Sequence, residues 1–221
     1  MKLADHLRRW VNPYKLSIKN HKGRIFLFED DDEEKDLLSK LLSLSPDKYL
    51  EIGSGSGNHL LGQAQKNPHA NYIGYEIRFK RSVRTIEKAE KMGLPNVFVF
   101  HQDANKISEV FSAKSLKGIF INFPDPWEKA RQQKKRILND KFLEISKNLL
   151  QEKGFISFKT DHREYFESFL KGISQNKDYV VTEQTFDLYQ SEFLAENVVT
   201  EFEKLFISQK LPIYYLKAVL V

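Results

Sequence analysis

The sequence predicts an α/β fold in which a mostly parallel sheet of seven strands, one of them antiparallel, carries helices on both faces. Two observations predict it. Short apolar runs alternate with amphipathic segments along the chain, and such alternation implies parallel strands joined by right-handed crossovers. Residues 186–198 have an irregular pattern in place of a crossover helix, so we expect the last strand to close the sheet in the antiparallel sense.

The expected elements follow in chain order. The strands are Lys48–Ile52, Asn71–Tyr75, Val97–Phe100, Lys117–Phe123, Phe155–Lys159, Tyr179–Thr182 and Ile213–Val221. The helices are Glu33–Leu44, Asn58–Gln65, Phe79–Met92, Asp140–Leu150, Arg163–Ser174 and Val199–Ser208. The first helix begins in the acidic run 29–36, because acids favour the N-terminal end of the helix dipole.

The composition is that of an ordinary globular protein. The 221 residues are 41% hydrophobic and 29% charged, which is usual for such proteins and enough to bury a sizeable core. There is no run of about 18 apolar residues and no apolar core of a signal peptide. Cysteine is absent, which excludes disulfides and thiol nucleophiles and is compatible with a reducing compartment. We therefore expect a cytoplasmic protein with no membrane partner.

The charge distribution suggests a basic arm, residues 1–28, ahead of a single domain, residues 29–221. The arm holds seven Lys or Arg and one acid. Trp10 and Tyr14 accompany these cations, and this combination suits nucleic acid, since cations meet phosphates and aromatic rings stack on bases. A solvated tail, partly disordered without RNA, is the alternative interpretation.

A nucleoside site is predicted where the first three strands end. Gly53, Gly55 and Gly57 follow the first strand, and glycines allow positive φ and a close approach of the backbone to a ligand. Glu76 ends the second strand at the distance from the loop that suits an acceptor for ribose hydroxyls. Asp103 follows the third strand, where the adenine would lie. An ordinary tight turn remains the alternative for the loop alone.

The same loop favours S-adenosylmethionine over a dinucleotide. Dinucleotide sites have the pattern G-x-G-x-x-G, whereas this loop has G-x-G-x-G followed by Asn58. Glu51, just before the loop, would repel a pyrophosphate and attract a sulfonium or an amino group. The six histidines show no metal-ligand spacing, and methyl transfer needs no metal, so we expect none.

A stiff loop, FPDPW at 123–127, follows the fourth strand. Proline fixes φ and removes a backbone donor, so Asp125 lies on a pre-shaped segment beside Trp127. Five cations come next: Lys129, Arg131, Lys134, Lys135 and Arg136. The arrangement suits a polar base against an aromatic wall with its phosphates held by cations. A solvated helix face is the usual alternative for such a charge run.

With these residues in place, the chain closely resembles the bacterial tRNA (guanine-N7-)-methyltransferases. The resemblance is carried by EIGSGSG (51–57), IGYEIRFKRSV (73–83), FPDPWEKARQQKKR (123–136), FKTDHREYF (158–166) and TEFEKLFISQKLPIYYLKA (200–218). It implies a Rossmann-like class I methyltransferase fold. It also implies methyl transfer from S-adenosylmethionine to N7 of a guanine in the variable loop of tRNA, with S-adenosylhomocysteine as product. We expect a monomer or a homodimer.

The resemblance also implies roles for individual residues. Cofactor contacts are expected from Glu51, Gly53, Gly55, Glu76, Arg78, Asp103, Ala104, Asn122 and Asp125, and Asp125 also matches the proposed catalytic aspartate. Substrate contacts are expected from Lys129, Asp161, Thr200, Glu201, Phe202 and Glu203, and RNA phosphate contacts from Arg131, Lys134, Lys135 and Arg136. The family's basic run commonly has a histidine where this chain has Gln132, and an arginine is replaced by lysine, which is not a neutral change.

The chemistry of the acceptor limits what Asp125 has to do. Guanine N7 carries an in-plane lone pair and no proton, so the enzyme mainly positions the reactants, which can supply about 7–11 kcal/mol. We expect Asp125 to orient the guanine edge or the cofactor amino group. The alternative roles are a helix N-cap for Asp161 and a solvated helix acid for Glu203. Two other functions stay open: methylation of an exocyclic amine of RNA, and a non-catalytic RNA-binding subunit with a vestigial pocket.

Overall fold

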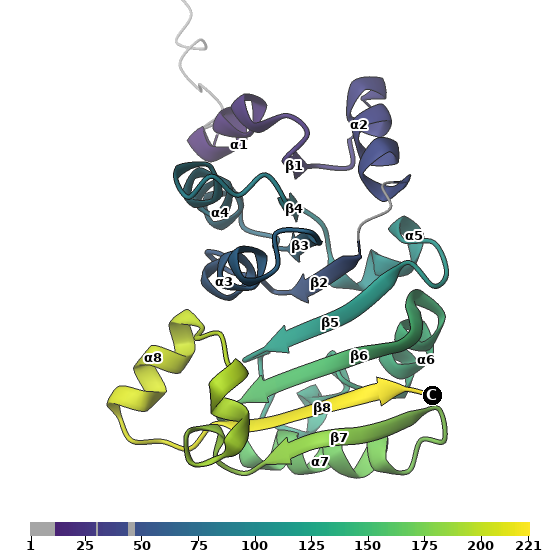
Figure 1. Cartoon of the computed structure of the whole chain (residues 1–221), viewed down its shortest axis with the longest axis vertical. Helices are drawn as coiled ribbons and strands as arrows, with labels where there is room; N and C mark the ends of the chain where they lie inside the picture. The colour runs from purple at the N-terminus through teal and green to yellow at the C-terminus, as the bar shows by residue number, and fades with distance from the viewer. Residues whose placement is uncertain (1–11, 30, 44–46) are drawn as a thin grey trace, which may run out of the picture.

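The computed structural model describes residues 12–29, 31–43 and 47–221, which build one sheet in the order β1-β4-β3-β2-β5-β6-β8-β7 (Figure 1). The strands are β1 (Ile25–Phe26), β2 (Lys48–Ile52), β3 (Asn71–Tyr75), β4 (Val97–Phe100), β5 (Leu116–Asn122), β6 (Leu150–Thr160), β7 (Tyr179–Thr185) and β8 (Tyr214–Leu220). Only β8 is antiparallel to its neighbours, β6 and β7. The carboxyl ends of the parallel strands therefore lie at one edge.

Helices cover both faces of this sheet. Buried residues of η1 (Ile18–His21), α3 (Asn58–Lys66) and α4 (Phe79–Lys91) form one core cluster with the sheet. Those of α2 (Asp32–Ser43), α5 (Ile107–Val110), α6 (Asp140–Leu149) and α7 (Arg163–Ser174) form the other. Helix α8 (Glu201–Ser208) lies on the side to which β5 and β6 point (Figure 1). Among the described residues, no helix has the length and the apolar character needed to cross a membrane.

The predicted α/β architecture is confirmed, but the strand count was wrong. An eighth strand, β1, pairs in parallel with β4 at one end of the sheet. Its two residues are too few to show the alternation by which a strand is recognised in a sequence. Strand β6 begins at Leu150, five residues before the predicted start at Phe155. The prediction was late because the exposed residues Glu152 and Lys153 interrupt the apolar pattern of the strand.

The described part of the predicted basic arm packs against α4 and β4. It forms α1 (Pro13–Ser17), η1 and β1. The Arg24 guanidinium donates hydrogen bonds of 2.8 Å to two backbone carbonyls, those of Leu94 and Val97, and the Lys80 ammonium lies 5.8 Å from the centre of the Tyr14 ring. Residues 1–11, with Trp10, lie outside the described residues. The division between arm and domain stays a prediction.

Candidate active site

A cavity of about 410 Å³ opens at the carboxyl ends of β2, β3 and β5, the edge at which parallel α/β sheets bind ligands. Its walls come from the glycine loop, the start of α4, the FPDPW loop and the start of α8. It brings together these predicted residues: Glu51, Gly53, Gly55, Glu76, Arg78, Asn122, Asp125, Lys135, Thr200, Glu201 and Phe202. Segments that are far apart in the sequence thus meet in one space.

Buried polar atoms without partners lie at the base of the cavity. The Asn122 amide donates a 2.9 Å hydrogen bond to Glu51 Oε1, and Glu51 is only 3% exposed. Its other oxygen, Oε2, is 3.3 Å from His59 Nδ1, but the pair does not have hydrogen-bond geometry, so both atoms are unpaired, as is Asn122 Oδ1. Such atoms cost about 1–3 kcal/mol each. A ligand amino group would satisfy the two oxygens, so these residues fit the amino-acid part of S-adenosylmethionine.

His59 lines the same cavity and lies beside Glu51, and nothing in their spacing in the sequence shows that they meet across the glycine loop. Its ring is 4% exposed and packs edge-on against Phe120, with the ring centres 4.9 Å apart.

The glycine loop leaves room for a ligand on one side and for α4 on the other. Gly53 has φ +73°, and a Cβ added there would meet no described atom within 4 Å. Gly57 has φ +80°, and its Cβ would come within 2.5 Å of the Thr85 side chain. The two glycines therefore have different roles: Gly53 exposes backbone to the cavity, and Gly57 lets the loop pack against α4.

Glu76 is held firmly at the cavity wall. Its carboxylate is 6% exposed and accepts a 2.9 Å hydrogen bond from the backbone N–H of Arg78. The Arg81 guanidinium lies 3.9 Å away. Burial raises the pKa of the Glu76 carboxyl, against the opposing effects of these two neighbours. A fixed carboxylate at the end of β3 suits an acceptor for the hydroxyls of a ribose.

Asp103 and Ala104 do not line this cavity. Asp103 is exposed and caps the turn η2 (Ala104–Lys106). Its carboxylate accepts a 2.9 Å hydrogen bond from the backbone N–H of Asn105. Ala104 lines a neighbouring cavity of about 450 Å³. The two cavities share Lys135 and Ile137.

The FPDPW loop is held between two residues in a left-handed conformation. Phe123 has φ 50° and Trp127 has φ 45°, a conformation that costs about 1–3 kcal/mol for a residue other than glycine. Phe123 is fixed by a 2.8 Å hydrogen bond from its N–H to Lys159 O and by stacking on Phe206. The Lys135 ammonium lies 4.7 Å from the Trp127 ring. Asp125, between these anchors, is exposed and faces the cavity.

Arg136 does not point to solvent, contrary to the expectation of a phosphate contact. It is 6% exposed. Its Nε donates a 2.7 Å hydrogen bond to Pro126 O, both of its Nη atoms donate to the Glu164 carboxylate, and its guanidinium lies 4.6 Å from the Tyr165 ring. The side chain is thus committed to the loop and to α7. A list of cations in a sequence does not show which one turns inward.

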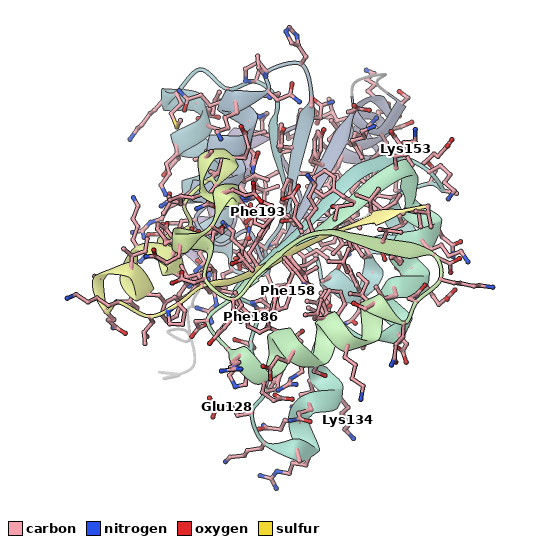
Figure 2. The ribbon with its side chains drawn as sticks, turned by 60° about the horizontal axis from the view of Figure 1, so that its bottom comes forward. Glu128, Lys134, Lys153, Phe158, Phe186 and Phe193 are labelled. Atoms are coloured by element: carbon pink, nitrogen blue, oxygen red, sulfur yellow. The ribbon has the colours of Figure 1, made fainter. Side chains whose placement is uncertain are left out.

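The other predicted phosphate contacts are exposed. Arg131, Lys134 and Lys135 lie on η3 (Ala130–Lys135) and are exposed to solvent. Figure 2 shows Lys134 on this segment and Glu128 just before it, both beyond α7. We call these three cations the η3 surface. Its Lys135 also lines the cavity, so the η3 surface is continuous with the site.

The predicted substrate residues fall into two groups. Glu201 and Phe202 are exposed at the cavity, whereas Glu203 is 0% exposed. Glu203 forms a capping box with Thr200 and an ion pair of 2.8 Å with Lys159. Burial tends to raise the pKa of the Glu203 carboxyl, but Lys159 and the hydrogen bonds outweigh it and hold that pKa below its usual value. As the structure stands, Glu203 supports α8 and has no surface for a substrate.

Lys129 and Asp161 are both exposed and lie outside the lining of the cavity. Asp161 is not the N-cap of α7. His162 fills that position, and its Nδ1 accepts a 3.1 Å hydrogen bond from the backbone N–H of Tyr165.

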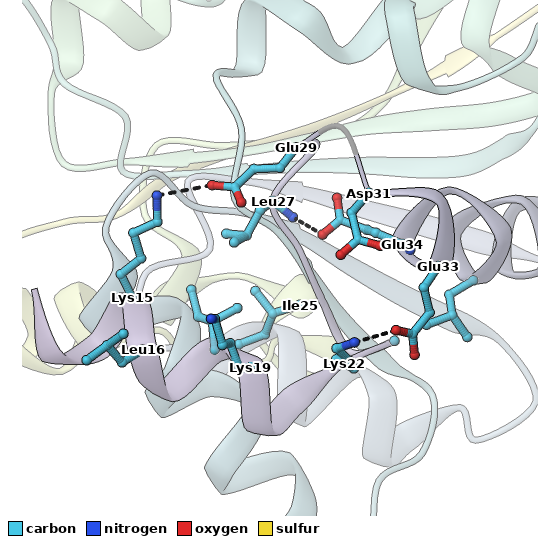
Figure 3. A pocket seen from close by; sticks show the side chains of 13 residues that line it. Lys15, Leu16, Lys19, Lys22, Ile25, Leu27, Glu29, Asp31, Glu33 and Glu34 are labelled. Carbon is cyan, nitrogen blue, oxygen red and sulfur yellow. Dashed lines mark hydrogen bonds and ion pairs between the residues drawn. The ribbon is translucent and has the colours of Figure 1, made fainter.

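A larger hollow, about 540 Å³, lies between α1 and α2 beside β1 (Figure 3). Several of its charged groups are bonded within the protein: Lys15 to Glu29 at 3.1 Å, Lys22 to Glu33, and Glu34 to the backbone N–H of Leu27 at 2.9 Å. Of the unpaired buried polar atoms in the described parts of the chain, none belongs to its lining. Size alone therefore does not identify the site.

Within residues 12–29, 31–43 and 47–221, no group of three or more His, Asp or Glu is placed to hold a metal.

Comparison with known proteins agrees with this geometry. Residues 46–216 match a family model described as "Putative methyltransferase". The chain is 38% identical over 170 residues to a tRNA (guanine-N(7)-)-methyltransferase of Bacillus licheniformis, covering 77% of this chain and 79% of that one. It is 32% identical to one of Lachnoclostridium phytofermentans, covering 87% and 90%.

A solved structure shows the same fold at much lower identity. The 16S rRNA methyltransferase KamB superposes with a TM-score of 0.62 at 15% identity, covering 89% of this chain and 98% of that one. From the relatives and the family match together, the chain belongs to the tRNA (guanine-N7-)-methyltransferase family of Rossmann-like, S-adenosylmethionine-dependent methyltransferases.

Proposed function

We propose that this protein transfers the methyl group of S-adenosylmethionine to N7 of a guanine in the variable loop of tRNA, in the cytoplasm. The observation that carries the proposal is the single cavity in which buried Glu51 and Asn122, the wall residue Glu76 and the stiff Asp125 loop meet. The relatives of Bacillus and Lachnoclostridium bear the name of this activity, which supports the choice of acceptor.

The residues at the base of the cavity would hold the cofactor. Glu51 and Asn122 offer unpaired oxygens to its amino group, and Glu76 offers a carboxylate to its ribose. Gly53 leaves the loop backbone open beside them. When bound, S-adenosylmethionine supplies an electrophilic sulfonium methyl group, so the protein's task is to aim that methyl group at the acceptor.

The acceptor would enter between the FPDPW loop and α8. Guanine N7 needs no deprotonation, and Asp125 would accept hydrogen bonds from the N–H edge of the base to fix its plane. Phe202, which lines the cavity from the α8 side, would contact the base face. Extruding a base costs a few kcal/mol, and these contacts would offset that cost.

Identification of the product tests the proposal. Purified protein is incubated with bulk tRNA and methyl-labelled S-adenosylmethionine, and the digested tRNA is analysed by mass spectrometry. We expect 7-methylguanosine, and no label in a tRNA transcript whose variable-loop guanines are replaced by adenine. Label on an exocyclic amine would show instead that the protein is an exocyclic-amine methyltransferase of RNA. Cofactor binding by calorimetry without any transfer would select the non-catalytic one.

Arg136→Gln should lower stability without changing the salt dependence of tRNA binding. Its buried, charge-assisted hydrogen bonds to Glu164 and Pro126 O suggest a loss of about 2 kcal/mol, measured by urea unfolding. A phosphate contact would instead reduce the slope of log K against log salt by about 0.9. The matched variant is Lys134→Gln on the exposed η3 surface, which should show the reverse pattern. The inward role of Arg136 would be contradicted if the slope of log K against log salt fell by the same amount in both variants.

A further inference from the structure

A small basic hollow lies beside the cofactor cavity, along α4. It has a volume of about 260 Å³ and is lined by Ser56, Arg84, Glu87, Lys88, Lys91 and Glu201. Two of these residues, Ser56 and Glu201, also line the cofactor cavity. The two spaces therefore adjoin at the glycine loop and the start of α8, and a polymer that leaves the cavity there would run along α4. We call this space the α4 hollow.

Positive charge is concentrated in the segment that borders it. Residues 78–91 contain six Lys or Arg and two Glu, in a chain whose net charge is +5. One of the two acids, Glu90, is 3.0 Å from His21 on the N-terminal segment. Across the hollow, Glu201 accepts a 2.9 Å hydrogen bond from Ser56 Oγ and lies 3.6 Å from Lys88. Glu90 and Glu201 are thus bonded within the protein, whereas Glu87, which also lines the hollow, is exposed.

The three cations of the α4 hollow differ in how they are held. Lys88 is fixed, because its ammonium donates 2.9 Å hydrogen bonds to Ser56 O and to Asn58 Oδ1. Arg84 and Lys91 are exposed, and within the described parts of the chain neither has an ion-pair partner. One anchored ammonium beside two uncommitted cations suits a phosphodiester, which offers two anionic oxygens to several donors.

We propose that the α4 hollow binds a backbone phosphate of the substrate RNA next to the target nucleotide. The inference rests on the proposed function. The cavity is bordered by Arg78 and Arg81 on the α4 side and by Lys135 of the η3 surface on the other. Cations on both sides would hold the phosphates that flank an extruded base, so the RNA backbone is fixed at two points while the base between them enters the cavity.

The double variant Arg84→Gln, Lys91→Gln tests the proposal. Binding of bulk tRNA is measured by fluorescence anisotropy over a series of salt concentrations. The hollow would hold one phosphate, and one lost phosphate contact lowers the slope of log K against log salt by about 0.7–0.9, so we expect the slope to fall by that amount. The charge-preserving variant Arg84→Lys, Lys91→Arg should keep the wild-type slope, which separates charge from a change in fold.

A matched control removes two positive charges elsewhere. Lys171→Gln with Lys177→Gln alters exposed residues at the end of α7 and just after it, and this variant should keep the wild-type slope. The proposal is overturned if the α4 variant also keeps that slope, or if the α7 variant loses as much. The methylated nucleoside made by the wild-type protein is unaffected by either outcome, so the proposed function is judged separately.

Discussion

Lys159→Met should destabilise the protein by about 3–5 kcal/mol, the usual cost of leaving one partner of a buried ion pair uncompensated. Lys159 is 3% exposed and Glu203 is 0% exposed. The Lys159 ammonium also donates to Asn197 Oδ1 at 2.9 Å and to Val198 O at 3.0 Å. One lysine at the end of β6 therefore holds the segment that leads into α8. Urea unfolding of the variant measures the loss.

The pH dependence distinguishes lost charge pairing from lost packing. In the wild-type protein the pKa of Glu203 is depressed, so its contribution is present above the unfolded-state pKa and disappears as the pH falls through the folded-state value. Without Lys159, burial would raise the pKa of Glu203. The destabilisation caused by its buried, unpaired carboxylate would then shrink in acid, where the group is protonated. The difference in unfolding free energy between wild type and variant should therefore narrow from pH 7 to pH 4. A constant difference would contradict the ion-pair explanation.

Lys204→Met is the matched control for this experiment. It makes the same substitution one residue beyond Glu203, at an exposed position of α8, and it should leave the unfolding free energy close to that of the wild type. The double variant Lys159→Met, Glu203→Met should recover part of the loss, since a buried ion pair can often be replaced by apolar residues. Recovery will be incomplete, because Tyr189 and Asn197 also bond to Glu203.

Asp125→Asn and Asp125→Ala should each lower the rate of methyl transfer by about 10²-fold at saturating cofactor, the effect expected when a reactant is no longer held in line. Asp125 is exposed on its stiff loop, so the folded protein should remain as stable as the wild type. The rate is measured by single-turnover transfer to tRNA. Glu128→Gln is the matched control, since Glu128 is an exposed acid of the same segment that does not line the cavity.

Guanine N7 carries no proton to be removed, so this transfer does not require a general base. The loss of rate in the two variants therefore measures how far Asp125 holds the reactants in line. Near-normal turnover in both variants would reject any role for this carboxylate in the reaction.

Much of the site could be predicted because its residues lie at or directly after the ends of strands, a position that the local sequence shows. Glu51, the glycines and Glu76 each stand directly after or at the end of a strand, and parallel strands bring their carboxyl ends to one edge. The helix and strand positions follow from apolar periodicity in the same way. The short elements β1, α1 and α5 were missed, because so few residues carry no period.

What could not be predicted depends on long-range pairing of charged groups. Arg136 turns inward because Glu164 and Tyr165 on α7 receive it. Glu203 is buried because Lys159 lies beneath α8. In the sequence, Arg136 belongs to a basic run and Glu203 to a substrate motif. Such a residue and its partner are separated by tens of positions, and nothing in the local pattern distinguishes a cation that meets solvent from one that meets a buried carboxylate.

The left-handed conformation of Phe123 and Trp127 has a consequence for the kinetics of recognition. A flexible loop would lose conformational entropy when RNA arrives, and that loss would weaken the complex. Here the ordering is completed during folding, when the ring of Phe123 stacks on Phe206 and the Lys135 ammonium approaches the Trp127 ring. The encounter with RNA then requires no search among loop conformers on the protein side, and the slow steps are left to the nucleic acid, which must unstack its base.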